Sequence, residues 1–205
     1  MSLSKFVKIS NISNLSDARY CAGMMVDVLG FEVIDHTSEH YVDPATFQEL
    51  TEWVAGVSFA GEFGHTSIGQ IQEIMGQYQV QYIETSSLEV LHSLSATGKE
   101  LIFRVSVSDE LQIKDLPDLL IQADEHASII IIEATDEVDK SSLMSSIDNL
   151  RLNAKTLRSY DLTPDGITNL EPFWTGIELK GSIEDKPGFK DFGEVMDILE
   201  ALEVD

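Results

Sequence analysis

The chain reads Val7-Lys8-Ile9-Ser10-Asn11-Ile12-Ser13-Asn14-Leu15-Ser16-Asp17-Ala18 near its N-terminus. A short apolar, β-branched run is followed by a polar turn, and helical spacing begins at Leu15 and Ala18 and continues to Met25. Asn14 or Ser13 can cap this helix, with Asp17 in its first turn. A strand that leads directly into a helix is typical of a parallel α/β sheet.

The same alternation recurs along the rest of the chain. Further helices are predicted to begin at Asp43-Pro44 and Thr163-Pro164-Asp165, with proline at the first helical position. The last helix carries Phe192, Val195, Met196, Ile198, Leu199 and Leu202. The predicted strands cover residues 6–9, 26–31, 54–59, 80–83, 101–105, 128–132, 156–157 and 174–179. Periodicity alone leaves a closed barrel and an open doubly wound sheet as alternatives.

A second motif, which we consider together with the first, lies near the C-terminus. The chain reads Gly176-Ile177-Glu178-Leu179-Lys180-Gly181-Ser182-Ile183-Glu184 and then Lys186-Pro187-Gly188-Phe189-Lys190-Asp191. Both motifs resemble the ends of phosphoribosylanthranilate isomerases, (β/α)8 enzymes of tryptophan biosynthesis whose first segment is usually V-K-I-C-G-I-T-N-L-x-D-A. Weaker similarity continues between them. The resemblance and the count of eight strands favour a single α/β domain over residues 1–205, a (β/α)8 TIM barrel.

The resemblance assigns catalytic roles to two positions. The family's catalytic base is a cysteine, and Ser10 stands in its place. A serine hydroxyl cannot act as a base unless another group activates it. The family's general acid is an aspartate that ends the sixth strand, and Glu133 fits that place with one extra methylene.

Further positions correspond to the family's substrate-binding residues. Lys8 and Asn11 flank the base position, where Asn11 replaces a glycine, and His40 replaces an arginine that binds a carboxylate. Tyr160-Asp161 replaces a glycine pair that presents N–H groups to phosphate. The remaining substrate-binding candidates are Glu84, Lys180, Gly181 and Ser182.

Several acidic residues fall at predicted strand ends. Glu32, Glu84, Glu133, Asp161 and Glu178 would together make the mouth of the barrel acidic. This pattern leaves two interpretations open: a site for a cation or cationic ligand, or carboxylates that point outward into solvent. Glu84 and Glu133 could instead divide acid and base roles between them.

Composition limits the partners. A formal net charge of −23 opposes binding to nucleic acid and to anionic membranes. No apolar run approaches the ~20 residues that span a bilayer, and no signal peptide is apparent, so we expect a cytoplasmic protein. A single cysteine, Cys21, excludes an internal disulfide. There is no metal-ligand motif, and we expect no cofactor.

Three hypotheses about function follow. The first is a phosphoribosylanthranilate isomerase-like protein without full isomerase activity, which binds a small ligand such as a phosphosugar, or a partner, at the mouth. The second is an active isomerase with Glu133 as acid and a substituted base. The third is a different reaction, or cation binding, at an acidic mouth. A monomer and a homodimer are equally compatible with the sequence.

Overall fold

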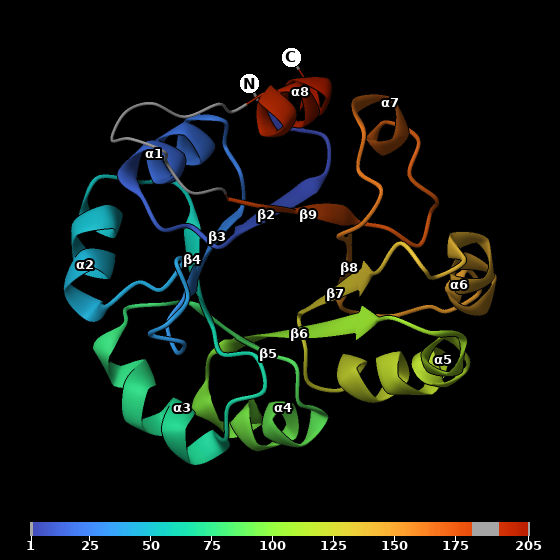
Figure 1. The fold of residues 1–205 in the computed structure, drawn as a ribbon, viewed down its shortest axis with the longest axis horizontal. Helices are drawn as coiled ribbons and strands as arrows, with labels where there is room; N and C mark the ends of the chain where they lie inside the picture. The colour runs from blue at the N-terminus through green and yellow to red at the C-terminus, as the bar shows by residue number, and fades with distance from the viewer. Residues whose placement is uncertain (1, 182–192, 205) are drawn as a thin grey trace.

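A closed barrel of eight parallel strands forms the centre of the molecule, and helices surround it (Figure 1). The computed structural model describes residues 2–181 and 193–204. The barrel strands are β2 (Phe6–Ser10), β3 (Val28–Glu32), β4 (Ser58–Glu62), β5 (Tyr82–Thr85), β6 (Glu100–Val107), β7 (Ile129–Ala134), β8 (Lys155–Arg158) and β9 (Gly176–Lys180). Pairing between β2 and β9 closes the ring. The predicted (β/α)8 fold is therefore confirmed.

Helices follow the barrel strands around the outside (Figure 1). They are α1 (Leu15–Gly23), α2 (Pro44–Glu52), α3 (Ile68–Ile74), α4 (Leu88–Leu94), α5 (Glu110–Asp124), α6 (Lys140–Ile147), α7 (Pro164–Ile167) and α8 (Gly193–Ala201). The short helices η1 (Met75–Gln77) and η2 (Ser95–Thr97) extend α3 and α4. In the described part of the chain, no helix combines the length and the apolar character needed to cross a membrane.

The predicted helix starts are confirmed by their caps. Asn14 accepts a hydrogen bond from the Asp17 N–H at 2.8 Å, and Asp43 accepts from the N–H groups of Ala45 and Thr46. Thr163 caps α7 in the same way. These side chains satisfy backbone donors that have no partner within their helix.

Two local predictions are wrong. Met25 does not continue the first helix, because α1 ends at Gly23 and Met25 has a φ of 61°. The run from Val54 does not begin a strand, since β4 starts only at Ser58. The last predicted helix is confirmed as α8, which contains Val195, Met196, Ile198 and Leu199, whereas Leu202 follows its end and Phe192 lies outside the described residues. A two-stranded antiparallel sheet of β1 (Ser2–Leu3) and β10 (Glu203–Val204) was not predicted.

Side chains inside the barrel form two zones. Successive residues of a strand point alternately into the barrel and toward the helices. Near the N-terminal ends of the strands, the interior is an apolar cluster of Val28, Ala60, Ile102, Ile129, Ile131 and Leu157. We call this cluster the lower layer. One or two inward positions further along most of the strands, the interior side chains are charged, whereas Ser159 follows Leu157 on the β8 side.

Candidate functional site

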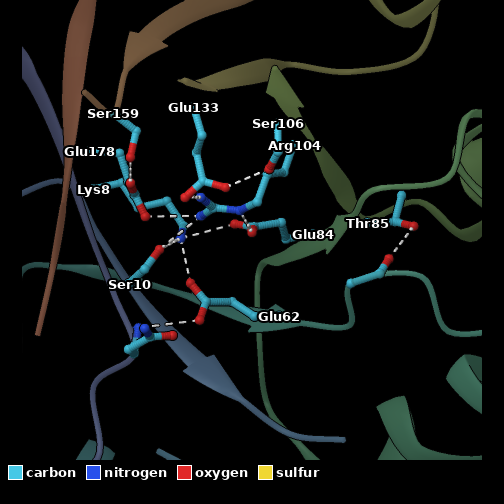
Figure 2. Close-up of polar contacts among 12 residues, drawn as sticks. Lys8, Ser10, Glu62, Glu84, Thr85, Arg104, Ser106, Glu133, Ser159 and Glu178 are labelled. Carbon is cyan, nitrogen blue, oxygen red and sulfur yellow. Dashed lines mark hydrogen bonds and ion pairs between the residues drawn. The ribbon is translucent and has the colours of Figure 1, made fainter. Parts of the chain in front are cut away.

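The charged side chains inside the barrel meet one another near the C-terminal ends of the strands (Figure 2). We call this group the upper layer; it comprises Lys8, Ser10, Glu62, Glu84, Arg104, Glu133, Glu178 and Lys180. The C-terminal ends of the strands form the face on which TIM-barrel enzymes carry their active sites.

Lys8 is the buried cation on the β2 side of this layer. The residue is 0 % exposed. Its Nζ donates to Ser10 Oγ and to Glu62 Oε1, the latter at 2.5 Å, and pairs with Glu84 Oε2 at 2.9 Å. Two of these contacts are hydrogen bonds, and the contact with Glu84 Oε2 is an ion pair, since that oxygen has no hydrogen-bond partner among the described residues. Gly30 makes room for this arrangement, because a Cβ there would lie 2.1 Å from Glu62 Oε1.

Arg104 is the second cation and joins the opposite side of the layer. Its Nε donates to Glu84 Oε1 at 2.5 Å, and its Nη2 donates to Glu178 Oε1 at 2.9 Å. Its Nη1 lies 3.0 Å from Glu133 Oε1. A second bond from Nη2 reaches Ser10 Oγ at 3.0 Å. One guanidinium therefore links three carboxylates and a hydroxyl.

Each carboxylate of the upper layer has both oxygens engaged. The second oxygen of Glu62 accepts from the Asn11 N–H at 3.2 Å, and that of Glu178 accepts from Ser159 Oγ. Glu133 accepts from Ser106 through Oε2 at 2.7 Å, and its Oε1 also pairs with Lys180 Nζ at 2.7 Å. Pairing of every carboxylate with a cation or a hydrogen-bond donor allows these charges to remain ionised in the barrel interior, although Glu84 Oε2 has only its ion pair with Lys8.

The pairing fixes the charge states. Burial alone would raise the pKa of Glu84, but the charges of Arg104 and Lys8 outweigh burial and lower the pKa to about 2. Burial likewise opposes ionisation of Glu133, yet Arg104, Lys180 and Ser106 hold its pKa below the usual value. For Lys8, burial lowers the pKa, and the charges of Glu62 and Glu84 more than reverse this effect. These groups are ionised at neutral pH.

A small pocket of about 190 Å³ opens above the upper layer. Ser10, Asn11, Glu133 and Lys180 are among the residues that line it. Its volume is below the ~300 Å³ at which pockets for drug-sized ligands begin. Exposure increases toward the opening: the side chain of Glu133 is 20 % exposed and that of Lys180 is 54 % exposed.

The structure brings together many of the predicted site residues. Ser10, Lys8, Glu84, Glu133 and Lys180 all belong to the upper layer, and Asn11 lies beside it. Of the five carboxylates predicted to make an acidic mouth, Glu84, Glu133 and Glu178 meet there, but three cations lie between them. The Glu32 carboxylate lines the pocket while accepting from the N–H groups of Ile34 and Asp35.

Other predicted site residues lie elsewhere. His40 and Tyr160 are not among the described residues that line the pocket. Tyr160 is buried against Trp174, with ring centroids 5.9 Å apart, and its hydroxyl has no partner among the described residues. The Gly181 N–H donates to the Ser10 carbonyl at 2.7 Å, so this N–H is already used. Ser182 and the Lys186–Asp191 motif lie outside the described residues.

Asn11 and Asp161 stand at positions where the family that the sequence resembles has glycine, and both adopt a backbone conformation that favours glycine. Asn11 has a φ of 59° and Asp161 a φ of 47°. Asparagine and aspartate are the residues other than glycine that adopt this region most readily. The local turns are therefore preserved although each position carries a side chain.

Sequence reasoning missed Glu62 and Arg104. Arg104 lay inside a predicted strand, two residues after Ile102, and the period of two places both side chains in the barrel. An arginine at an inward position of a barrel strand needs an acidic partner, and this signal was present in the sequence. Glu62 lay beyond the end of the predicted strand over residues 54–59, so the alternation of side chains along that strand could not place it inside the barrel.

A larger groove of about 530 Å³ lies on the outside of the barrel, between α2 and the segment that leads into β5. It is lined by aromatic and amide side chains, including Phe59, Gln77 and Gln79, and among the described residues that line it Glu52 is the one ionisable group. It therefore lacks the paired acid and base groups that general acid–base chemistry requires. In the described part of the chain, no group of three or more His, Cys, Asp or Glu residues is arranged to hold a metal ion.

Known structures share this fold over nearly the whole chain. Phosphoribosylanthranilate isomerase from Thermotoga maritima matches with a TM-score of 0.73 and 22 % identity, over 97 % of this chain and 98 % of that one. A phosphoribosylanthranilate isomerase in complex with reduced 1-(o-carboxyphenylamino)-1-deoxyribulose 5-phosphate matches with the same TM-score and coverage at 21 % identity. TrpF from Jonesia denitrificans matches at 0.73 and 17 % identity, over 97 % and 96 %.

At these identities the likeness concerns the fold. No model of a known protein family matches the sequence, and no curated protein matches it. The chain thus shares the (β/α)8 fold of these isomerases, and what its upper layer does has to be argued from its own residues.

Proposed function

We propose that this protein is a phosphoribosylanthranilate isomerase-like barrel without isomerase activity, and that it binds a small polar ligand in the pocket at the mouth. The observation that carries the proposal is the engagement of Ser10. Its Oγ accepts from Lys8 Nζ and from Arg104 Nη2. A hydroxyl oxygen has two acceptor lone pairs, and two cations occupy both.

The reaction that the resemblance implies begins when a base removes a proton from the sugar C2. A base needs a free lone pair directed at that proton and a pKa near the working pH. Ser10 has neither, because cationic donors surround it. Glu84 is also a poor base, since both its oxygens are engaged and its pKa is lowered to about 2.

The acid that the reaction requires is equally compromised. A general acid must be protonated before it donates. The pKa of Glu133 is held below its usual value by Arg104, Lys180 and Ser106, so it is a carboxylate at neutral pH. These charge states argue against the alternative in which Glu133 serves as acid and Glu84 as base.

Binding remains a plausible role for the mouth because its outer part is less constrained. Lys180 and Glu133 are partly exposed and line the pocket together with Asn11. The pocket is smaller and more polar than sites for drug-sized ligands, so the ligand that we propose for it is small and polar. The buried ion pairs beneath it hold Glu133 in a fixed position.

The test is a fluorescence assay of phosphoribosylanthranilate consumption, with the substrate generated in situ. We expect the wild-type protein to show no more turnover than a Glu133→Ala variant. Glu137→Ala is the matched control, because Glu137 is an exposed glutamate four residues further along the chain. Thermal melting checks that all three proteins are folded. Turnover in the wild type and in Glu137→Ala that disappears in Glu133→Ala would overturn the proposal.

A further inference from the structure

We infer that the pocket at the mouth recognises a small zwitterion, a molecule that carries an ammonium group and a carboxylate close together, as a free α-amino acid does. This inference rests on the proposed function and gives the ligand a chemical class. It is carried by the ion pair between Glu133 and Lys180 at the opening of the pocket.

The two members of this pair are held very differently. Glu133 is fixed from behind by Arg104 and Ser106, at 3.0 and 2.7 Å. Lys180 is 54 % exposed, and in the described part of the chain Glu133 is the partner recorded for its Nζ. Lys180 can therefore swing away while the Glu133 carboxylate stays in place.

Opening this pair costs little. Ion pairs that reach solvent are typically worth between 0 and about 1 kcal/mol. A ligand ammonium group can then replace the Lys180 ammonium on Glu133 Oε1. The displaced Lys180 stays close by, where its ammonium group can bind the carboxylate of the same ligand.

Charge balance favours a zwitterion over a ligand of one sign. In the described upper layer, four carboxylates face three cations, and Glu32 adds a further negative charge to the pocket lining. A simple anion would enter against this excess. A simple cation would displace Lys180 and leave it without a partner. A zwitterion exchanges one internal pair for two pairs with the ligand and changes no net charge.

The size of the pocket sets an upper limit on the ligand. Its volume of about 190 Å³ corresponds to roughly six water molecules at ~30 Å³ each. Glycine or alanine fits this volume, whereas a bulky aromatic amino acid has to project out of the opening. Asn11, which also lines the pocket, adds an amide that can both donate and accept.

The experiment compares three probes by titration calorimetry: L-alanine, N-acetyl-L-alanine, which lacks the ammonium group, and L-alaninamide, which lacks the carboxylate. We expect L-alanine to bind with a Kd no weaker than about 10 mM and each derivative to bind at least about tenfold more weakly. Equal binding of all three, or no binding of L-alanine, would overturn the inference.

Substitutions of Glu133 and Lys180 test whether L-alanine binds at the mouth of the barrel. We expect Glu133→Gln and Lys180→Gln each to weaken L-alanine binding by about tenfold. Lys180→Gln keeps the test valid if Glu133→Gln disturbs folding, since Lys180 is largely exposed. Glu137→Gln and Lys114→Gln are matched controls at exposed positions and should bind like the wild type. Unchanged affinity in both mouth variants would also overturn the inference.

The outcomes separate this inference from the proposed function. If a derivative with only one charge binds as well as L-alanine, and Lys180→Gln weakens that binding, the zwitterion inference fails while ligand binding at the mouth survives. If the wild type consumes phosphoribosylanthranilate, the proposed function fails whatever the amino acid does.

Discussion

The two zones inside the barrel are built on the same eight strands but are held together by different forces. The lower layer is apolar, with Ile102, Ile131 and Leu157 each 0 % exposed. The innermost part of the upper layer is almost as deeply buried, with Lys8 at 0 % and Glu84 at 4 % exposure, whereas Lys180 at the opening is largely exposed. The lower layer is stabilised by the removal of apolar area from water, which has no preferred direction. The upper layer depends on specific donors that meet specific acceptors.

This difference decides how the stability of each layer responds to amino-acid substitutions and to pH. An apolar layer tolerates substitutions that conserve volume, because any close packing serves. A buried network of ion pairs tolerates the loss of a whole pair better than the loss of one partner, since the remaining charge is left without compensation. The upper layer should therefore be sensitive to single substitutions and to pH, and the lower layer to volume alone.

The largest effect is expected from Arg104→Met. This substitution keeps a long side chain but leaves Glu84, Glu178 and Glu133 without their shared cation. We expect the free energy of unfolding at pH 7 to fall by about 3–5 kcal/mol, the usual cost of breaking a buried pair. Urea denaturation measures this change.

A second substitution, Glu178→Met, tests whether the uncompensated carboxylates cause this loss of stability. In Arg104→Met combined with Glu178→Met, one uncompensated carboxylate is removed as well, so the pair of substitutions should cost less than the sum of the two single ones. Lys114→Met on the exposed face of α5 is the control and should change stability by less than about 0.5 kcal/mol. A loss below about 1 kcal/mol for Arg104→Met would show that the upper layer is not held by its charges.

Local patterns in the sequence predicted alternating strands and helices, and the resemblance to a known family, together with the count of eight strands, favoured the closed barrel over an open sheet. Apolar runs alternate with helical spacing eight times, and caps such as Asn14 and Asp43 mark where helices begin. The strand ends were predicted less well. The predicted strands over residues 26–31, 80–83 and 128–132 stop before Glu32, Glu84 and Glu133, which the structure includes in β3, β5 and β7.

The physical reason is that a charge normally signals the end of a buried strand. Inside this barrel the charged positions are still strand positions, because their partners come from strands far away in the sequence. Lys8 and Glu62 are separated by 54 residues, and Arg104 and Glu178 by 74. Such pairing is invisible to any local pattern. The sequence could therefore propose carboxylates and two lysines, Lys8 and Lys180, as site residues, but it could not predict which carboxylate each cation pairs with.

The next largest loss of stability is expected when the pH is lowered. The pKa of Glu84 is about 2 in the folded protein, against a usual value of 4.5. A carboxyl whose pKa is lowered by folding contributes stability above its unfolded pKa, and this contribution is lost as the pH falls through the folded pKa. We expect about 3 kcal/mol of the free energy of unfolding to be lost from this group between about pH 5 and pH 2.

The comparison with Arg104→Met isolates this contribution from other carboxyls, such as the exposed helix cap Asp43. Without Arg104, Lys8 is the one remaining cation recorded beside Glu84 among the described residues, so burial raises the pKa of Glu84 and the residue gains less from being ionised. The difference in stability between wild type and Arg104→Met should therefore shrink as the pH is lowered. Urea denaturation at several values between pH 3 and pH 7 provides the measurement. A difference that stays constant would rule out Glu84 and its neighbours as the titrating groups.

The smallest effect is expected from Ile131→Val in the lower layer. Ile131 is 0 % exposed, and the substitution removes one methylene from the apolar cluster. The loss should be about 0.5–1.5 kcal/mol, the usual cost of this change in a core. Because the lower layer contains no ionisable group, the loss should be the same at pH 7 and at pH 4. Ile131 is also the neighbour of Arg104 across the β6–β7 pair, which makes it a sensitive position for this test. If the loss were larger at pH 7, the lower layer would be positioning the guanidinium above it, and the two layers would have to be treated as one coupled core.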